Sequence, residues 1–135
     1  MRYLVSTKEL EEASSYSPQS RAQYFLSRAI ESEEVWGLNN PSGWILKEQN
    51  DQTILPIWPY QQMATGCAQG EWENYEANAV SLEHFVYKVL PMMVTQDILV
   101  EIFPTNSNPG ELMSAEKLAS IFEGLLESGE YYMEG

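Results

Sequence analysis

The sequence predicts a single α+β domain, with a mostly antiparallel, or mixed, sheet of about four to six short strands packed with about four to five helices. Apolar residues recur with helical spacing in several segments, whereas short β-branched and aromatic runs separated by turn residues fill the middle of the chain. No internal repeat or low-complexity linker divides the 135 residues, a length that can bury a core without disulfides. We therefore expect residues 1–128 to form one domain and residues 129–135 to form a flexible acidic tail.

Two helices are expected near the N-terminus. Ser6 and Glu9 have the spacing of a capping box, which predicts a short helix that ends at about Ser15. Ser17 followed by Pro18 predicts a second helix start, with serine as the N-cap and proline at the first helical position. Apolar residues of this second helix share one face. They are Ala22, Phe25, Leu26, Ala29 and Ile30.

Beyond the second helix, the apolar residues follow the pattern of β-strands. Three short runs, over 35–38, 43–47 and 53–58, are separated by turn-rich segments of four and five residues. Connections of this length favour an antiparallel meander. Pro56 has no backbone N–H to donate, so we expect its strand to be an edge strand or to carry a bulge at this residue.

The next segment is expected to alternate between helix and strand. A short helix is expected over 60–69, followed by a polar and aromatic connection and a brief strand over 77–80. Ser81 then predicts the N-cap of a longer helix. Because the ring of Pro91 clashes with the carbonyl four residues earlier, we expect a kink or an end near Leu90.

The run over 98–103 is the clearest strand of the chain, and it stops at Pro104. Its nearly continuous apolar sequence predicts a central strand that is covered on both faces. A turn-rich loop is expected over 105–110, and residues 111–113 are expected to return as a strand. Ser114 predicts the N-cap of the last helix.

The charge of the chain restricts its partners. The formal net charge is -13, and residues 71–135 hold 12 acidic and 2 basic residues of it. Nucleic-acid affinity depends on clustered lysines and arginines, so this balance argues against nucleic acid and against an anionic membrane surface. A basic protein is the partner that such a surface favours.

The chain carries no signal for a membrane or an oxidising compartment. No stretch approaches the roughly 18 consecutive apolar residues of a spanning helix, and residues 1–5 run into polar sequence without a signal-peptide core. Cys67 is the one cysteine, so an intramolecular disulfide cannot form. We therefore expect a cytoplasmic protein.

Sequence motifs of known catalytic chemistry are absent from the chain. It has no nucleophile elbow, no glycine-rich phosphate loop and no zinc-protease helix. With one histidine and one cysteine, the usual zinc sets cannot be assembled. His84 is expected as an ordinary surface or boundary histidine, with a catalytic base as the minor alternative. Cys67 is expected as a small buried hydrophobe, with a reactive thiol as the minor alternative. We therefore expect no catalytic residue, metal ligand or cofactor, and we favour a protein that is not an enzyme.

Other charged residues have simpler explanations than a site. The glutamates gathered at 31–34 and 71–76 lack the alternating Asp and Asn of a calcium loop, which favours solvated faces. Arg21, Tyr24 and Arg28 share one helical stripe, where an anion site is conceivable. Pairing with neighbouring glutamates in 31–34, such as Glu31, is the more economical explanation.

The tryptophans are expected to divide between the core and a binding surface. Trp36 and Trp44 are expected in the core. Two other aromatic pairs could line a pocket or anchor an interface. These pairs are Trp58 with Tyr60, and Trp72 with Tyr75.

Taken together, these motifs resemble a family of small bacterial proteins catalogued as a domain of unknown function, DUF2750. The resemblance extends over residues 5–127 and implies a bacterial cytoplasmic protein of one domain, with no established activity and no catalytic residue to carry over. The segments that carry it are 34–38, 43–44, 55–59, 70–72, 82–91 and 100–104.

Two functions of different class remain open. The first is a non-enzymatic protein-binding module, immunity- or adaptor-like, that engages a basic partner and is a monomer or a homodimer. The second is a small-molecule-binding protein or an unrecognised enzyme with an aromatic-lined pocket. Either function would use a common set of candidate binding residues. The set is Trp58, Tyr60, Glu71, Trp72, Glu73, Tyr75 and Glu76.

Overall fold

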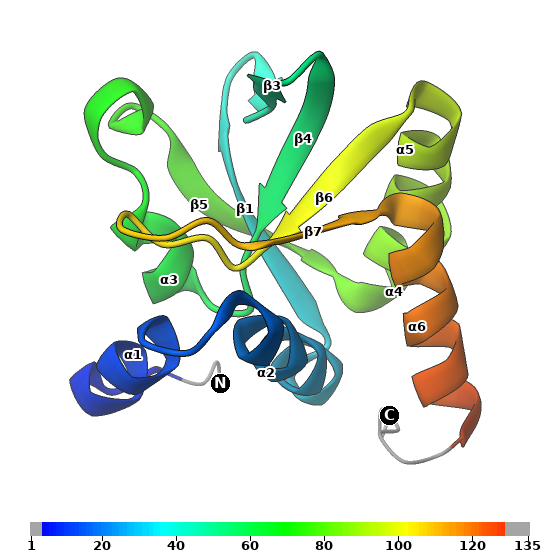
Figure 1. Cartoon of the computed structure of the whole chain (residues 1–135), viewed down its shortest axis with the longest axis horizontal. Coiled ribbons are helices and arrows are strands. Elements are labelled where there is room, and N and C mark those ends of the chain that lie inside the picture. The colour runs from blue at the N-terminus through cyan, green and yellow to red at the C-terminus, as the bar shows by residue number, and fades with distance from the viewer. Residues whose placement is uncertain (1–3, 129–135) are drawn as a thin grey trace.

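The computed structural model describes residues 4–128, and its helices and strands confirm the α+β class. Two sheets meet near the centre of the molecule, with α2 across one end and α5 and α6 along one side (Figure 1). The elements in chain order are α1 (Thr7–Ser14), α2 (Pro18–Ser32), β1 (Glu34–Asn40), β2 (Gly43–Trp44), β3 (Lys47–Gln49), β4 (Gln52–Ile57), α3 (Gln61–Gly66), η1 (Gly70–Trp72), β5 (Glu76–Ser81), α4 (Leu82–His84), η2 (Phe85–Val89), α5 (Leu90–Gln96), β6 (Ile98–Ile102), β7 (Glu111–Ser114) and α6 (Ala115–Ser128).

The strands form one sheet of three strands in the order β2-β1-β5 and one of four in the order β3-β4-β6-β7. All neighbouring strands are antiparallel except β4 and β6, which are parallel. The sheets are joined where Trp36 and Trp58 exchange two backbone hydrogen bonds, each with an N···O distance of 2.9 Å. The prediction of a central strand over 98–103 is confirmed, because β6 lies between β4 and β7.

The single meander expected over 35–58 is wrong. The β1–β2 and β3–β4 hairpins are both antiparallel, but they belong to different sheets. The chain leaves the first sheet at Ile45, whose side chain is buried and whose N–H donates to the Leu38 carbonyl. Burial of this side chain turns the chain inward, so residues 45–46 connect the two sheets instead of extending a strand.

The strand of Pro56 is interior and pairs with β6 in unbroken register, so both predicted alternatives, an edge strand or a bulge at this residue, are wrong for β4 as a whole. β4 is flanked by β3 and β6, and Pro56 is paired with Glu101 of β6. The pairing with β3 stops at Ile54, two residues before the proline. Because β3 is short, Pro56 has a paired residue only in β6, so fewer strand hydrogen bonds require the N–H that proline lacks.

The predicted serine N-caps are confirmed at the starts of α1, α2, α4 and α6. In each, the serine hydroxyl accepts a hydrogen bond from the backbone N–H three residues later, at 3.0 to 3.1 Å. The helix expected over 60–69 is shorter, because α3 ends at Gly66. None of the helices described between residues 4 and 128 is long and apolar enough to cross a membrane. The capping serines are Ser6, Ser17, Ser81 and Ser114.

The helix after Ser81 does not end near Leu90 but continues through Pro91 to Gln96. The segment before the proline is π-helical, and the Leu90 N–H donates to the Phe85 carbonyl five residues earlier. Pro91 itself has no N–H, so a regular α-helical ladder would lose a bond here. The widened turn accommodates the proline, as π-bulges do inside α-helices.

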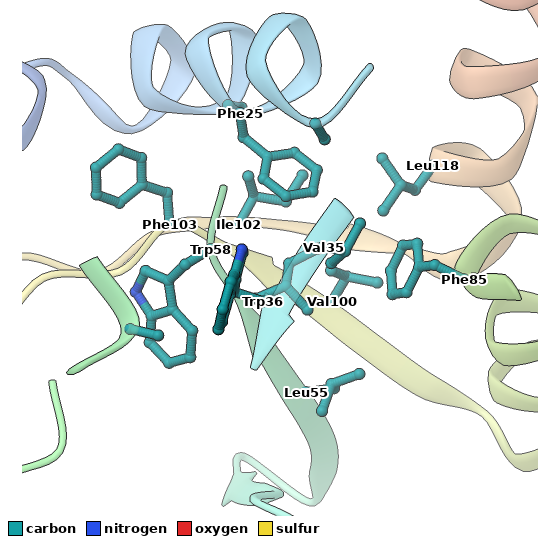
Figure 2. Packing of buried hydrophobic residues seen from close by; sticks show 14 of the residues in the cluster. Phe25, Val35, Trp36, Leu55, Trp58, Phe85, Val100, Ile102, Phe103 and Leu118 are labelled. Atoms are coloured by element: carbon teal, nitrogen blue, oxygen red, sulfur yellow. The ribbon is translucent and has the colours of Figure 1, made fainter. Parts of the chain in front are cut away.

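Large apolar side chains from both sheets and from the covering helices form one core. Phe25 of α2 lies on one side of the strands, and Phe85 and Leu118 approach from the helices beside them (Figure 2). Trp36 is 5% exposed and packs in this core, as predicted. Trp44 is 40% exposed, so its predicted core position is wrong. Its indole lies over Gly37 of β1, at the side of a small pocket lined by apolar residues.

We expect Gly37→Ala to destabilise the fold by about 1 kcal/mol, because overfilling a packed contact forces neighbouring groups to move. A Cβ at this position would lie 3.0 Å from two ring carbons of Trp44, Cε3 and Cζ3. Trp44 is half-exposed and can swing outward, which limits the cost and should shift its fluorescence to the red. Urea unfolding followed by fluorescence measures both effects. Gly66→Ala is the control, since its Cβ would meet no atom within 4 Å; an equal loss there would contradict the steric explanation.

Candidate functional site

A polar cleft opens between β3, the segment that follows α3, and the loop between β6 and β7. Its volume is about 380 Å³, and most of its lining side chains are polar. We call this cavity the polar cleft. Its lining residues are Lys47, Gln49, Cys67, Gln69, Glu71, Trp72, Glu101, Pro104, Thr105, Asn106, Ser107, Asn108 and Pro109.

A second open cavity of about 450 Å³ lies beside the polar cleft. Four residues line both cavities, so the two form neighbouring parts of one depression. The second part adds an aromatic side chain, Tyr75, and a further carboxylate, Glu48. The residues shared by both parts are Lys47, Gln49, Glu71 and Trp72.

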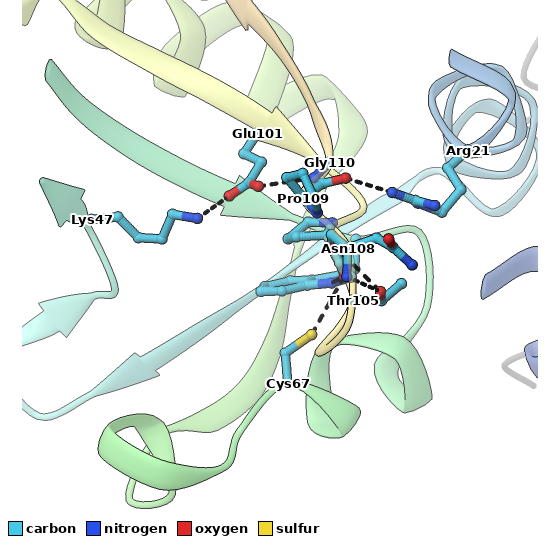
Figure 3. Close-up of polar contacts among 10 residues, drawn as sticks. Arg21, Lys47, Cys67, Glu101, Thr105, Asn108, Pro109 and Gly110 are labelled. Atoms are coloured by element: carbon cyan, nitrogen blue, oxygen red, sulfur yellow. Dashed lines mark hydrogen bonds and ion pairs between the residues drawn. The ribbon is translucent and has the colours of Figure 1, made fainter. Parts of the chain in front are cut away.

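An ion pair between Lys47 and Glu101 lies at the base of the polar cleft. Lys47 is paired with Ile54 of β4, and Ile54 is paired with Leu99 of β6. Paired residues share a face, and so does the residue two positions along a strand, which places Glu101 on the face of Lys47. The lysine therefore reaches diagonally over β4, and its Nζ lies 2.5 Å from Glu101 Oε1 (Figure 3).

The 103–110 loop, which lines the polar cleft, is fixed to the rest of the molecule at both ends. Arg21 of α2 donates from Nε to the Phe103 carbonyl at 2.9 Å and from Nη2 to the Pro109 carbonyl at 2.5 Å. Glu101 Oε2 accepts the Gly110 N–H at 2.9 Å. Figure 3 shows Arg21 and Glu101 reaching this end of the loop from opposite sides. These hydrogen bonds hold the loop in place, so it forms a fixed wall of the cleft.

The Pro104 carbonyl receives two further contacts. The indole Nε1 of Trp58 donates to it at 2.9 Å, and the Cys67 thiol lies 3.4 Å from it. Burial raises the pKa of the Cys67 thiol to about 11. The thiol is therefore protonated near neutral pH, which agrees with the prediction of a small buried hydrophobe. His84, predicted at the surface or at the boundary of the core, is exposed.

The structure brings together three of the candidate binding residues and separates the others. Glu71 and Trp72 line both parts of the depression, and Tyr75 lines the second part. Glu73 and Glu76 are exposed beside this segment, and neither is among the lining residues. The remaining two candidates, Trp58 and Tyr60, are 0% and 5% exposed and belong to the core.

The helical stripe of α2 is divided between a surface and a buried role. Arg28 pairs with Glu31, as expected, and also with Glu9. Tyr24 donates its hydroxyl to Glu9, and burial together with this bond raises the pKa of Tyr24. Arg21 is 1% exposed and donates to backbone carbonyls, so its predicted pairing with glutamates is wrong. Its position on α2 turns it toward the loop between β6 and β7.

The sequence reasoning missed the residues that form the base of the polar cleft. Glu101 carried a usable signal, because a carboxylate inside a strand predicted to be covered on both faces is almost never buried without a partner. Lys47 and the amides of the loop carried none, since exposed strand ends and turns commonly contain such residues. Lys47 and Glu101 become neighbours through the pairing of β3 with β4 and of β4 with β6.

The charges of the depression favour a cation. Lys47 is the one basic residue among the described lining residues, and Glu101 compensates its charge. The carboxylates of Glu48 and Glu71 then leave the depression with a negative balance. Among residues 4–128, no group of three His, Cys, Asp or Glu side chains is placed to hold a metal ion. The arrangement can bind a positively charged group through carboxylates, amides and aromatic rings.

Comparison with known proteins gives a family match over most of the described chain. Residues 22–121 match the model of a family described as "Protein of unknown function (DUF2750)". The matched range contains α2 from residue 22 onward, the seven strands described between residues 4 and 128, and the whole depression. No curated protein matches the chain.

Proposed function

Because the chain belongs to the DUF2750 family, whose description names no activity, we propose from the cleft itself that the protein is a non-enzymatic binding module for a basic segment of a partner protein. In this proposal it acts in the bacterial cytoplasm as an immunity- or adaptor-like protein. The observation that carries the proposal is the negative depression with aromatic walls, formed by Glu48, Glu71, Trp72 and Tyr75.

The charge of the whole protein supports a basic partner. A formal net charge of -13 produces a negative potential that speeds the encounter with a positively charged protein. The exposed carboxylates of Glu73 and Glu76 lie in the same segment as Trp72 and extend the negative surface beyond the depression. Long-range attraction and local recognition therefore act on the same class of partner.

The aromatic rings of the depression supply contacts that suit arginine. Trp72 and Tyr75 are half-buried, so each ring is held by packing and still has accessible surface. A guanidinium stacks on such a ring with a gain of about 0.5 to 2 kcal/mol, and the amides of Gln49 and Gln69 accept its remaining N–H groups. A basic segment with arginine therefore fits better than one with lysine alone.

A direct test is a titration with the capped peptide acetyl-Gly-Arg-Gly-Arg-Gly-Arg-amide, followed by tryptophan fluorescence and calorimetry. We expect saturable binding that weakens as salt rises, because exposed charges are screened within about 10 Å at 0.1 M. The same peptide with citrulline in place of arginine keeps the length of the side chain but loses the charge and two N–H donors, and it should bind at least tenfold more weakly. Equal binding of the two peptides would contradict the proposal.

Two variants locate the binding to the depression. Glu71→Gln and Trp72→Ala should each weaken peptide binding by about three- to tenfold, since each removes one contact of about 1 kcal/mol. Glu123→Gln is the matched control, because it removes the same charge from an exposed position of α6 that lines neither part of the depression. If Glu123→Gln weakened binding as much as Glu71→Gln, the interaction would be a diffuse charge effect.

A second candidate is a small-molecule site. The volume of the polar cleft falls within the roughly 300 to 1,000 Å³ of known small-ligand pockets. The same charges would select a compact molecule that carries an amine. Titration with spermidine separates the two: tighter binding of spermidine than of the arginine peptide would favour the small molecule.

A further inference from the structure

We infer that Glu101 forms the innermost subsite of the polar cleft for a guanidinium or ammonium group, and that Lys47 occupies this subsite in the free protein and is exchanged for the cation of the ligand. This inference rests on the proposed function, because it concerns the same cleft and the same class of partner. In the free protein, the Lys47 ammonium thus occupies the position that the cationic group of the ligand would take beside Glu101.

The first step of the argument is the burial of Glu101. Its side chain is 3% exposed, yet it lines the polar cleft from the central strand β6. Oε2 is fixed by the Gly110 N–H, whereas Oε1 faces the ammonium of Lys47. A cation from solvent can therefore reach Oε1 only by taking the place of the Lys47 ammonium.

The second step is that Oε1 is incompletely satisfied. It is buried, and no residue between 4 and 128 donates a hydrogen bond of ordinary geometry to it, although Lys47 Nζ lies within ion-pair distance. A buried acceptor gains stability when such a bond is made. The planar guanidinium presents its donors in a fixed fork, which suits a carboxylate better than the single point charge of an ammonium.

The third step is that Lys47 can leave at small structural cost. It stands at the start of β3, a three-residue edge strand, and its side chain is 25% exposed. Rotation of the long side chain would return the ammonium to water without moving the strand. Lys47 also lines both parts of the depression, so its withdrawal would open the path from the aromatic walls to Glu101.

The test compares Lys47→Ala with Lys88→Ala by titration with the arginine peptide described above. Both variants make the net charge more negative by one, but Lys88 is exposed on η2, outside the depression. We expect Lys47→Ala to tighten binding about tenfold and Lys88→Ala to change it less than twofold. Equal effects of the two variants would overturn the inference.

Two further variants fix the sign and the place of the effect. Lys47→Arg should weaken peptide binding several-fold, because the internal guanidinium competes better for Glu101, whereas Lys88→Arg should leave it unchanged. The double variant Lys47→Ala with Glu101→Gln should lose the gain of the single variant. A gain that persists in the double variant, or unchanged binding to Lys47→Arg, would overturn the inference even if Lys47→Ala proved too unstable to titrate.

A probe without any peptide separates this inference from the proposed function. Butylammonium, which corresponds to the end of a lysine side chain, should raise the melting temperature of Lys47→Ala and not that of the double variant. If butylammonium raised the melting temperature of Lys47→Ala but the peptide did not bind, the proposed function would be rejected and the cation subsite would be retained. If the peptide bound equally to Lys47→Ala and Lys88→Ala, and butylammonium did not raise the melting temperature of Lys47→Ala, only the cation subsite would be rejected.

Discussion

Replacement of Arg21 by methionine is expected to lower the free energy of unfolding by about 3 to 5 kcal/mol, a large part of the roughly 5 to 15 kcal/mol of a small domain. Arg21 is 1% exposed and donates hydrogen bonds to the carbonyls of Tyr16, Phe103 and Pro109. Methionine fills a similar volume but donates nothing. Loss of the buried bond to the Phe103 carbonyl and of the two part-buried bonds to Tyr16 and Pro109 would account for most of this decrease.

The conformation of Phe103 increases the dependence on Arg21. Phe103 has a φ of 55°, a left-handed conformation that a bulky residue rarely adopts. Its N–H donates to the Ile57 carbonyl, and its carbonyl accepts from Arg21 Nε, so hydrogen bonds on both sides hold the unusual backbone. Without Arg21 we expect the 103–110 loop to relax, and the polar cleft to lose the wall that this loop provides.

Urea unfolding of Arg21→Met, Arg21→Lys and Arg28→Met tests the role of Arg21. Arg21→Lys keeps the charge but not the fork of donors, so it should lose about half as much stability as Arg21→Met. Arg28 is the control on the same helix, because its ion pairs are partly exposed and contribute at most about 1 kcal/mol. A loss at Arg21→Met no larger than that at Arg28→Met would show that the loop is fixed by other contacts.

The parts of the fold that depend on neighbouring residues are readable from the sequence. The four serine N-caps, the apolar face of α2 and the strand β6 all follow from residues within one or two turns of each other. The arrangement of two sheets is different, because the chain leaves the first sheet at the buried Ile45 and the two sheets are joined by the pairing of Trp36 with Trp58. These contacts join segments whose local sequences look like ordinary strands.

The candidate site was readable where aromatic and acidic residues lie together in the chain, at Glu71, Trp72 and Tyr75. Its base was not, because Lys47 and Glu101 meet only through two successive strand pairings. Likewise, Arg21 and Pro109 are 88 positions apart, and nothing in the helical stripe of α2 indicates a loop carbonyl as a partner. Trp58 was a candidate binding residue but is buried in the core, because the sequence Trp-Pro-Tyr is equally compatible with a core position.

Among the glycines that the structure describes, Gly110 should be the one at which alanine is most damaging, with a loss of at least about 3 kcal/mol, at the upper end of the cost of overpacking. A Cβ at this position would lie 2.3 Å from the Ile102 carbonyl oxygen and 2.9 Å from the Pro104 nitrogen. These are backbone atoms, so no side chain can move aside to make room. The loop would have to shift away from β6, and Glu101 Oε2 would lose the Gly110 N–H.

Gly124→Ala provides the opposite expectation within the same fold. Gly124 lies inside α6, and its Cβ would meet no atom within 4 Å, so alanine should stabilise the protein by about 0.5 to 1 kcal/mol through its higher helix propensity. Urea unfolding of the two variants should therefore give changes of opposite sign.

Because Gly110 anchors the loop and the buried carboxylate together, Gly110→Ala should also abolish the tighter peptide binding of Lys47→Ala. A Gly110→Ala variant that unfolded at the same urea concentration as the natural sequence would show that the loop and Glu101 are independent.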